Sequence, residues 1–277
     1  IFTCVLREKS KPSSVSLTFN LTDEPTNRIR VLYPKPFQRN FTVCHAALFN
    51  FNNPKQIINS FEINRVLGAQ HFYVYNLSVS NTTDAVLRHY QRLGLLTVMP
   101  WRLPASGVWY HGQLLAINDC VYRNRHASQF VVIHDTDEYI IPEVHGSWAE
   151  VLRAAEDDYF KNGTKARNIK NVGSFIFQSS FYYNTSDKLW GSIKRDASMT
   201  ADEEAFLTKH GVFPFIHTLR DGNIFNLFER SKAIVRPESV IQAGIHSVDV
   251  QRTSAGTAVV SRSLAALHHY RYFPNTN

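Results

Sequence analysis

The sequence predicts an α/β fold with a mostly parallel sheet flanked by helices. Short apolar runs rich in β-branched residues alternate with helical apolar patterns through the first half of the chain. Two of the helical patterns close on a Leu-Gly pair, Leu67-Gly68 and Leu93-Gly94, and each pair leads directly into a strand. A further buried strand, residues 130–133, runs into an acidic stretch. Because strands that alternate with helices form parallel sheets with right-handed crossovers, we expect that arrangement here.

The chain divides into an irregular N-terminal segment, residues 1–40, and one domain, residues 41–277. The segment is polar and interrupted by prolines, whereas the domain opens with a buried strand. Asn53 and Pro54 supply a cap and a first-turn proline, so a helix begins there. In the first half of the domain we expect strands at 41–49, 71–75, 95–99 and 130–133, and helices at 54–67, 83–93 and 110–125.

The second half has a different pattern and indicates a mixed sheet. An amphipathic helix near 147–160 is followed by an apolar strand at 172–177. Later short apolar runs predict strands at 232–236, 244–250 and 265–269. No linker separates the two halves, so we expect these strands to belong to the same domain.

The composition is that of a folded, basic protein. The chain has 277 residues, of which 44% are hydrophobic, and this is ample for one large core. The formal net charge is +7, but the basic residues form no dense block and no nucleic-acid-binding motif occurs, so we expect no nucleic-acid partner. No apolar run is long enough to span a membrane. Because the chain begins at Ile1 rather than Met, we expect a membrane anchor or targeting segment outside it in the full-length protein.

Sequons and cysteines bear on the cellular compartment. Three cysteines, Cys4, Cys44 and Cys120, match neither a disulfide framework nor a zinc pattern. Two interpretations of Cys44 and Cys120 stay open, either separate buried apolar side chains or a disulfide in an oxidising lumen. Six Asn-x-Ser/Thr sequons favour the secretory pathway, where such sites are glycosylated: Asn20, Asn40, Asn76, Asn81, Asn162 and Asn184.

The acidic stretch after residues 130–133 carries the main candidate site. Asp135 and Asp137 stand one residue apart where a buried strand ends, and ligands of open α/β sheets bind at the carboxyl ends of the strands. Carboxylate ligands suit Mn²⁺ or Mg²⁺, with the phosphates of a substrate completing the shell. Strand alternation predicts that the neighbouring Glu138 points back toward the core. On this motif alone, a solvated turn is the competing interpretation.

Other polar residues can complete such a site. His246 and His269 each follow a short apolar run and are candidate metal ligands, although a single histidine is often structural. Between them, we expect His246 to contribute more to metal affinity. Asn50 and Asn76 follow the first two strands at the ligand edge of the sheet. They are either contacts for a nucleoside or ordinary loop residues.

Phosphate contacts must come from a metal ion and from basic side chains, because no phosphate-binding loop or dinucleotide motif occurs. Lys232, Arg230 and Arg236 lie in one basic stretch and are candidates for this contact. A solvated edge strand is the alternative interpretation of the same stretch. Among the three we choose Lys232 as the cofactor-binding residue.

A set of stretches occurs in a distinctive order over residues 41–273. They are Cys44-His-Ala-Ala-Leu-Phe-Asn50, Leu67-Gly-Ala-Gln-His-Phe-Tyr-Val-Tyr-Asn76, Gly112-Gln113, Asn118-Asp-Cys120, His134-Asp-Thr-Asp-Glu-Tyr-Ile-Ile-Pro142, Lys232-Ala-Ile-Val-Arg-Pro237, Gly244-Ile-His246 and His268-His-Tyr-Arg271. With these stretches in this order, the chain resembles glycosyltransferase family 92.

The resemblance implies a GT-A type fold, inverting chemistry and dependence on Mn²⁺ or Mg²⁺. It also implies a UDP-sugar donor, with galactose moved from UDP-galactose to a glycan acceptor, and a type II membrane protein of the Golgi. On this basis Asp135 and Asp137 match the metal and nucleotide motif of the family. His246 or His269 matches its late histidine.

The motifs do not fix the catalytic base. Inversion needs a carboxylate that takes the proton of the attacking acceptor hydroxyl. Asp202 and Glu203 lie in the acceptor-side half, and we choose Glu203 with Asp202 beside it. The competing interpretation is a helix N-terminus, where acidic residues are common.

Two other functions fit parts of the pattern. A sugar-binding protein without catalysis would keep the same fold. A phosphotransferase with a strand-Asp-x-Asp motif would need Thr or Val two residues after the second Asp, where this chain has Tyr139. Release of UDP from UDP-galactose with Mn²⁺ would separate an enzyme from a binding protein.

Overall fold

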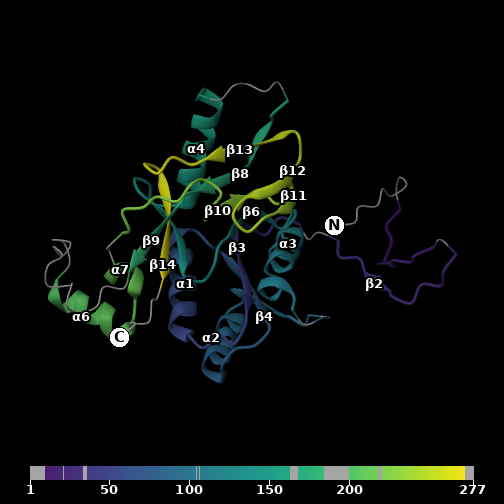
Figure 1. Ribbon diagram of the computed structural model, residues 1–277, viewed down its shortest axis with the longest axis horizontal. Coiled ribbons are helices and arrows are strands. Elements are labelled where there is room, and N and C mark those ends of the chain that lie inside the picture. Colours follow the sequence, from purple (N-terminus) through teal and green to yellow (C-terminus); the bar gives the residue numbers. More distant parts are fainter. Residues whose placement is uncertain are drawn as a thin grey trace.

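The computed structural model of the chain is shown in Figure 1. It describes residues 10–20, 22–33, 36–103, 105, 107–162, 168–183, 200–217 and 220–271. Cys4 and the sequon at Asn184 lie outside the described residues. Within these ranges, no helix combines the length and the apolar character needed to span a bilayer.

The core of the domain is a seven-stranded sheet. Its strands are β3 (Arg39–Leu48), β4 (His71–Asn76), β5 (Leu96–Pro100), β6 (Ser128–Ile133), β8 (Asn171–Phe177), β10 (Lys232–Val235) and β13 (Ala255–Val259). They follow the order β13-β8-β10-β6-β3-β4-β5, and all neighbours are parallel except that β10 runs against both β6 and β8. The predicted mostly parallel sheet with a mixed second half is therefore confirmed.

Helices cover both faces of this sheet. On one face, α1 (Pro54–Leu67), α2 (Asn81–Arg92) and α4 (Trp148–Asn162) bury apolar residues in a cluster with Val43 and Val132. On the other face, α3 (Gln113–Arg123) packs in a cluster with Cys44 and Val131. Adjacent residues of β3 and β6 thus point to opposite, equally buried faces, which explains why these strands are continuous apolar runs in the sequence.

The helix ends follow capping signals in the sequence. The side chain of Asn53 accepts a hydrogen bond from the backbone N–H of Gln56, and Pro54 opens α1. Gly68 ends α1 with a φ of 124°, a backbone conformation that favours glycine. The second helix, α2, begins earlier than predicted because its N-cap is Ser80, whose hydroxyl accepts from the Thr83 N–H.

The third helix, in contrast, begins later than predicted. A short 3-10 turn, η1 (Trp109–Gly112), precedes α3, and Tyr110 and His111 within it have φ of 45° and 55°. Left-handed backbone at non-glycine residues is strained and needs support from its surroundings. Here the Nε1 of Trp101 donates to the carbonyl of His111 (2.9 Å), and the ring of His111 stacks on Phe49 with centroids 3.9 Å apart. These contacts hold η1 next to the end of β3.

A second sheet has three strands in the order β7-β14-β9. These are β7 (Glu138–Pro142), β9 (Ser179–Tyr183) and β14 (Ala265–Arg271), of which only β14 was predicted. The predicted strand at 244–250 is wrong in its first part. Residues 244–247 instead form the turn between β11 (Val240–Ala243) and β12 (Val248–Gln251), closed by a hydrogen bond from the Gly244 N–H to the Ser247 carbonyl.

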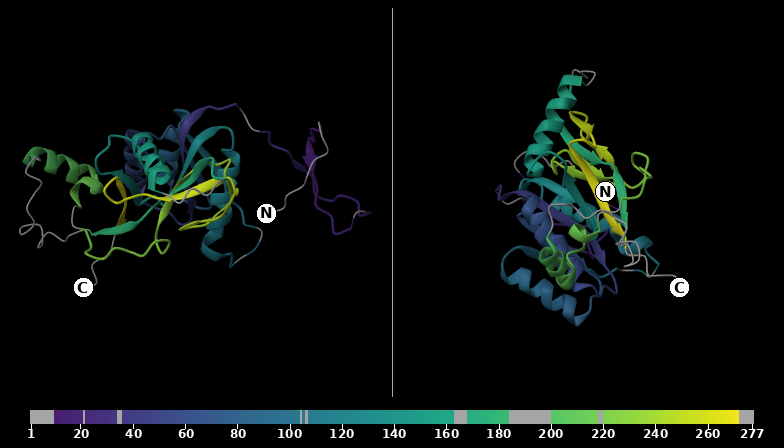
Figure 2. Two further views of the ribbon diagram at one scale, coloured as in Figure 1. Left: turned by 90° about the horizontal axis from the view of Figure 1, so that it is seen from above. Right: turned by 90° about the vertical axis from the view of Figure 1, so that its left-hand side faces the viewer.

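The remaining described elements lie outside the main sheet. Two helices of the second half are α6 (Ala201–His210) and α7 (Phe213–Ile216). The N-terminal segment carries a small antiparallel hairpin of β1 (Ser14–Val15) and β2 (Ile29–Arg30). Figure 2 shows this hairpin standing away from the body of the domain, on the opposite side from α6. No described residue before Phe41 belongs to either buried apolar cluster.

Cys44 and Cys120 form a disulfide that joins β3 to α3. Their Cα atoms are 6.1 Å apart, and both residues are fully buried. The sequence left two interpretations of these cysteines open, and the structure shows the disulfide rather than two separate buried side chains. It ties the strand that precedes the candidate site to a helix on the other side of the sheet from α1.

Candidate functional site

A cavity of about 530 Å³ opens at the edge of the main sheet where β3 and β6 end. This volume lies in the range of small-molecule sites. Both halves of the domain line it. Its acidic, basic and histidine lining residues are His111, Asp135, Asp137 and Glu138 from the first half, and Arg230, His246 and His269 from the second.

The acidic residues occupy a tight turn between β6 and β7. The backbone N–H of Glu138 donates to the carbonyl of Asp135 (3.2 Å), and the carboxylate of Glu138 accepts from the N–H of Asp135 (2.9 Å). Glu138 therefore points inward and is 1% exposed, as strand alternation predicts. The side chains of Asp135 and Asp137 are 34% and 31% exposed and line the cavity. The turn thus presents two partly exposed carboxylates to the cavity, whereas the third, Glu138, borders the cavity but is buried.

Two buried histidines hold this turn in place. The ring of His134 contacts the side-chain oxygen of Asn64 in α1 (3.2 Å) and the carbonyl of Asp135 (2.7 Å). The ring of His45 contacts the carbonyl of His134 and the hydroxyl of Ser60, each at 3.2 Å. Burial lowers the pKa of His45 to about 4 and that of His134 to about 3, so both rings are neutral at neutral pH. They position the turn without adding charge to it.

Lys232 is buried next to the aspartate pair. It is 2% exposed, and its Nζ lies 2.7 Å from an oxygen of Asp135 and 3.2 Å from an oxygen of Glu138. Burial alone would lower the pKa of Lys232, but the two carboxylates raise it above its ordinary value. Burial likewise raises the pKa of Asp135, but the ammonium of Lys232 outweighs this effect and the pKa is lowered. The sequence predicts Lys232 as a cofactor contact, and the structure gives its ammonium two protein carboxylates as partners instead.

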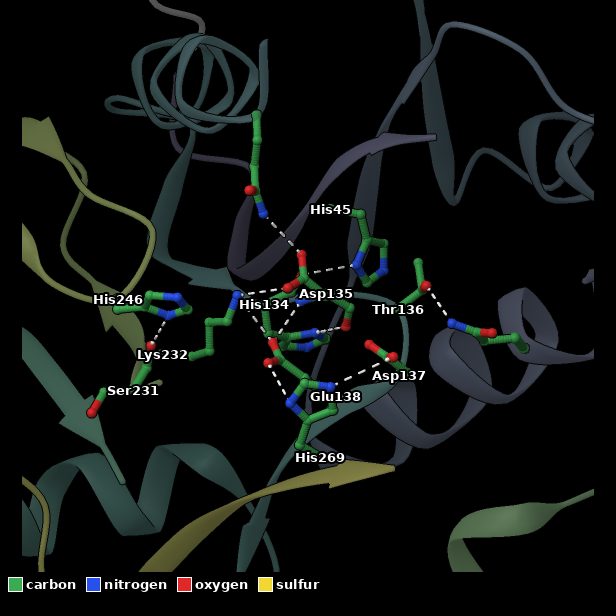
Figure 3. A network of polar contacts seen from close by, with 12 residues as sticks. His45, His134, Asp135, Thr136, Asp137, Glu138, Ser231, Lys232, His246 and His269 are labelled. Carbon is green, nitrogen blue, oxygen red and sulfur yellow. Dashed lines mark hydrogen bonds and ion pairs between the residues drawn. The ribbon is translucent and has the colours of Figure 1, made fainter. Parts of the chain in front are cut away.

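His269 lies beside the acidic turn, opposite Glu138 in the ladder between β14 and β7. Its Nε2 is 3.6 Å from an oxygen of Asp137, and its Nδ1 is 3.3 Å from an oxygen of Glu138. Burial lowers the pKa of His269, but the nearby carboxylates of Asp137, Glu138 and Asp135 outweigh it and raise the pKa. His269 is therefore held between two carboxylates (Figure 3).

His246 lies on the other side of Lys232, as Figure 3 shows. Its Nδ1 contacts the carbonyl of Ser231 at 3.2 Å. Burial, followed by the charge of Lys232, lowers the pKa of His246. Because His269 and not His246 is the imidazole beside Asp137, the geometry favours the reverse of the predicted ranking of the two histidines.

Asn50 and Asn76, the predicted nucleoside contacts, do not line the cavity. The backbone N–H and the side-chain oxygen of Asn50 both bond to the hydroxyl of Ser78, at 2.8 and 3.1 Å. The side-chain oxygen of Asn76 is buried and has no hydrogen-bond partner within the part of the chain that the structure describes. The lining residues on either side of Asn50 are Phe49 and Phe51.

Asp202 and Glu203, the predicted catalytic acids, lie at the start of α6 and do not line the cavity. The carboxylate of Glu203 accepts from the backbone N–H and the hydroxyl of Thr200, at 2.7 and 2.8 Å, and forms a capping box. These hydrogen bonds lower the pKa of Glu203. The structure therefore matches the competing interpretation, an acidic helix N-terminus, and brings neither carboxylate to the cavity.

The cavity also has lining residues that the sequence did not single out. The amide of Gln113 donates to an oxygen of Asp135 (3.3 Å). Trp109 and Tyr110 line the cavity with exposed fractions of 78% and 67%. Gln113 lies in one of the stretches of family likeness, which was a usable signal, whereas no pattern distinguishes Trp109 or Tyr110 from other exposed aromatic residues. Arg230 also lines the cavity, although the sequence offered it only as one of three similar cations.

The sequence model of glycosyltransferase family 92 matches residues 39–276, which include every residue of the cavity lining described above. The chain belongs to glycosyltransferase family 92. With the strand order of the main sheet, membership of this family identifies the domain as a GT-A type fold.

Relatives of this family 92 chain include proteins named as galactosyltransferases. Beta-1,4-galactosyltransferase galt-1 of Caenorhabditis elegans is 24% identical over 274 residues, covering 96% of this chain and 55% of the relative. Galactan beta-1,4-galactosyltransferase GALS2 of Arabidopsis thaliana is 23% identical over 145 residues, covering 50% of this chain and 28% of the relative. The chain thus spans about half the length of galt-1. Among solved structures, S. aureus TarS with UDP-GlcNAc is 13% identical with a TM-score of 0.43, covering 85% of this chain and 60% of that chain.

The family 92 cavity offers donor atoms that suit a divalent cation. Asp135 and Asp137 present carboxylate oxygens, and the imidazole of His269 lies next to Asp137. Among the described residues, no three acidic, histidine or cysteine side chains are already grouped as a metal cluster. Mn²⁺ and Mg²⁺ are often held by one or two carboxylates while waters and substrate phosphates complete the shell. The donor set fits a cation that is bound in this way.

Proposed function

We propose that the protein is a metal-dependent inverting glycosyltransferase that moves galactose from UDP-galactose to a glycan acceptor. The observation that carries this proposal is the carboxylate pair of Asp135 and Asp137, presented to a cavity at the end of β6 in a chain of family 92. Ligands of such sheets bind at the carboxyl ends of the strands. A cavity of about 530 Å³ is large enough for a nucleotide sugar.

In the proposed reaction the bond between the anomeric carbon and the diphosphate breaks, so the departing diphosphate gains negative charge. When bound, a divalent cation supplies charge neutralisation and Lewis acidity to that leaving group. We assign its binding to Asp135 and Asp137, with His269 as the adjacent imidazole. Lys232 and Gln113 each bond one oxygen of Asp135, so they keep this carboxylate charged and oriented.

The acceptor hydroxyl must lose a proton as it attacks, and inversion requires a carboxylate that accepts it. We leave this role without an assigned residue. Asp202 and Glu203 remain the candidates from the sequence, but neither lines the cavity. The carboxylates that do line it are those of the acidic turn.

The names of the relatives support galactose as the transferred sugar. Galt-1 and GALS2 are both named as beta-1,4-galactosyltransferases, at 24% and 23% identity. The name of GALS2 also contains the word galactan, which supports a glycan as the acceptor here. The assignment of a uridine nucleotide to the donor rests on the resemblance to family 92.

We also propose that the protein works in the Golgi lumen as a type II membrane protein, anchored by a segment outside this chain. Disulfides such as Cys44–Cys120 form and persist in oxidising compartments. Glycosylation requires accessible asparagines. Exposed sequon asparagines of the described residues are Asn20, Asn40, Asn81 and Asn162.

A screen of UDP-sugars with and without Mn²⁺ tests the proposed reaction. The protein is incubated with each sugar and a galactose-terminated oligosaccharide, and the release of UDP is measured together with the stereochemistry of the product. We expect UDP-galactose to be consumed fastest, only with a divalent cation, and to give a β-linked product. Binding of UDP-galactose without release of UDP under any of these conditions would indicate a sugar-binding protein instead.

A further inference from the structure

Three basic residues near β10 can be compared as contacts for an anion. The ammonium of Lys232 is already occupied by two carboxylates. The guanidinium of Arg236 bonds the carboxylate of Glu156 (2.9 Å), and Arg236 does not line the cavity. Arg230 differs from both, because it lines the cavity and makes no hydrogen bond or ion pair with any described residue. Of the three, only Arg230 has a charge that no described residue occupies.

Aromatic rings hold the side chain of Arg230 in place. Its guanidinium carbon lies 5.3 Å from the ring centroid of Phe181 and 5.1 Å from that of Phe225. The two rings pack edge to face with centroids 4.8 Å apart, and arginine is attracted to such rings by its charge. Phe181 also packs against the ring of His269, with centroids 4.9 Å apart. Arg230 and the imidazole beside Asp137 therefore share an aromatic neighbour.

The Nε of Arg230 is buried and has no hydrogen-bond partner among the described residues. A buried donor without a partner is costly, and a bound acceptor relieves that cost. An arginine also presents paired N–H groups in one plane, which match the oxygens of a phosphate better than an ammonium does. The geometry of Arg230 is therefore that of a site for an oxyanion.

The charges of the proposed substrates indicate which anion this is. The sugar of the donor and a galactan-type acceptor are neutral, whereas the diphosphate of the donor carries the negative charge. The carboxylates of Asp135 and Asp137 line the same cavity and can contact a diphosphate only through a cation. A guanidinium in that cavity can contact it directly.

We propose that Arg230 binds the diphosphate of the nucleotide donor and remains in contact with it as it becomes the leaving group. This inference rests on the proposed function and assigns to Arg230 the phosphate contact that the sequence assigned to Lys232, whose ammonium is paired with two carboxylates. Both halves of the domain then contact the diphosphate. The first half does so through a cation on the acidic turn, and the second half through the guanidinium of Arg230, which precedes β10.

Binding measurements can separate the diphosphate from the nucleoside. UDP and uridine are each titrated calorimetrically, with Mn²⁺ present, into the wild-type protein and into Arg230→Gln, Arg230→Lys and Arg92→Gln. Arg92 is an exposed residue at the end of α2 outside the cavity lining, so its variant removes the same charge elsewhere. The melting temperature of each variant shows whether it is folded. If Arg230→Gln does not fold, Arg230→Lys is compared with the wild type in its place.

We expect Arg230→Gln to weaken the binding of UDP roughly 10- to 100-fold, the loss of one or two charge-assisted hydrogen bonds, and to leave uridine unchanged. Arg230→Lys should recover part of the loss, because it keeps the charge without the planar fork, and Arg92→Gln should bind as the wild type does. Equal UDP affinity in the wild type and the Arg230 variants would overturn the inference. An equal loss for UDP and uridine would also overturn it, and a wild-type protein that binds no UDP would overturn the proposed function as well.

Discussion

The two halves of the domain supply opposite charges to one cavity. The first half supplies carboxylates from a single turn of four residues, Asp135 to Glu138, which is held by its own hydrogen bonds and by two buried histidines. The second half supplies basic and imidazole groups from separate elements: Arg230 before β10, His246 after β11, and His269 in β14. The acidic side is therefore arranged locally, whereas the basic side exists only when the whole domain is folded.

Removing a carboxylate from the first half should abolish the proposed reaction while the fold persists. We expect Asp137→Ala to lower Mn²⁺-dependent transfer from UDP-galactose by about 10²- to 10³-fold, because stabilising a developing charge has effects of that size. The side chain is 31% exposed, so the melting temperature should stay near that of the wild type. Asp157→Ala, in an exposed position of α4, is the matched control and should keep its activity. Full activity of Asp137→Ala would remove the metal assignment.

Removing the buried cation of the second half should instead weaken the fold. We expect Lys232→Met to lower the free energy of unfolding by about 3–5 kcal/mol, because it leaves the buried carboxylate of Glu138 without its partner. Chemical denaturation measures this loss. The double variant Lys232→Met/Glu138→Gln should recover part of it, since the second change removes the unpaired charge. If the double variant is as unstable as the sum of the two single variants, the pairing is not the reason for the loss.

Lowering the pH should lower the stability of the fold, because His45, which holds the acidic turn, is buried in its neutral form. Burial lowers the pKa of His45 to about 4 in the folded chain, against about 6.5 in the unfolded chain. Below pH 6.5 the unfolded chain therefore binds a proton that the folded chain does not, and stability falls as the pH drops toward 4. His45 should account for up to about 3 kcal/mol of this fall.

Denaturation of the wild type and of His45→Gln at several pH values between 7 and 4.5 measures that contribution. Because the variant cannot take up this proton, its stability should fall less steeply with pH. The same slope in both proteins would show that the ring of His45 is not held in its neutral form.

Metal affinity can distinguish the two late histidines. We expect His269→Ala to weaken the binding of Mn²⁺ roughly tenfold or more, since its ring lies beside Asp137, and His246→Ala to have a smaller effect. Titration of Mn²⁺ into both variants, followed by the electron paramagnetic resonance of the free ion, requires no turnover. The reverse order would return the ligand role to His246, which the sequence favours.

The smallest effect is expected at the start of α6. Glu203→Gln removes the charge of a carboxylate that caps its own helix outside the cavity, so transfer activity should stay close to that of the wild type. Initial rates with UDP-galactose at saturating Mn²⁺ make the comparison, with Asp202→Asn beside it. A large loss of kcat in Glu203→Gln at an unchanged melting temperature would restore the catalytic role expected from the sequence.

Most of the first half could be predicted because its signals are local. The cap at Asn53, the stop at Gly68 and the buried runs of β3 and β6 each depend on neighbouring residues. The strand β7 was missed because it begins inside the acidic turn and pairs with β14, which lies far along the chain. Long-range pairing of this kind leaves little mark on a short stretch of sequence.

The candidate site shows the same division. The carboxylates of Asp135 and Asp137 were found because they directly follow a buried strand. Lys232 was chosen over Arg230 and Arg236, because a sequence does not show that the carboxylate partners of Lys232 and Arg236 come from distant elements, the acidic turn and α4. Glu203 was chosen from an acidic group although Thr200, three residues before it, completes a capping-box pattern that predicts a helix start.

The role of the acidic turn is tested by the effect of Mn²⁺ on the affinity for UDP, measured by calorimetry in the wild type and in Asp137→Ala. We expect Mn²⁺ to strengthen the binding of UDP to the wild type and to have no such effect on Asp137→Ala. If UDP binds the wild type equally well with and without Mn²⁺, the acidic turn does not hold a cation for the diphosphate, and the proposed metal-dependent reaction is contradicted.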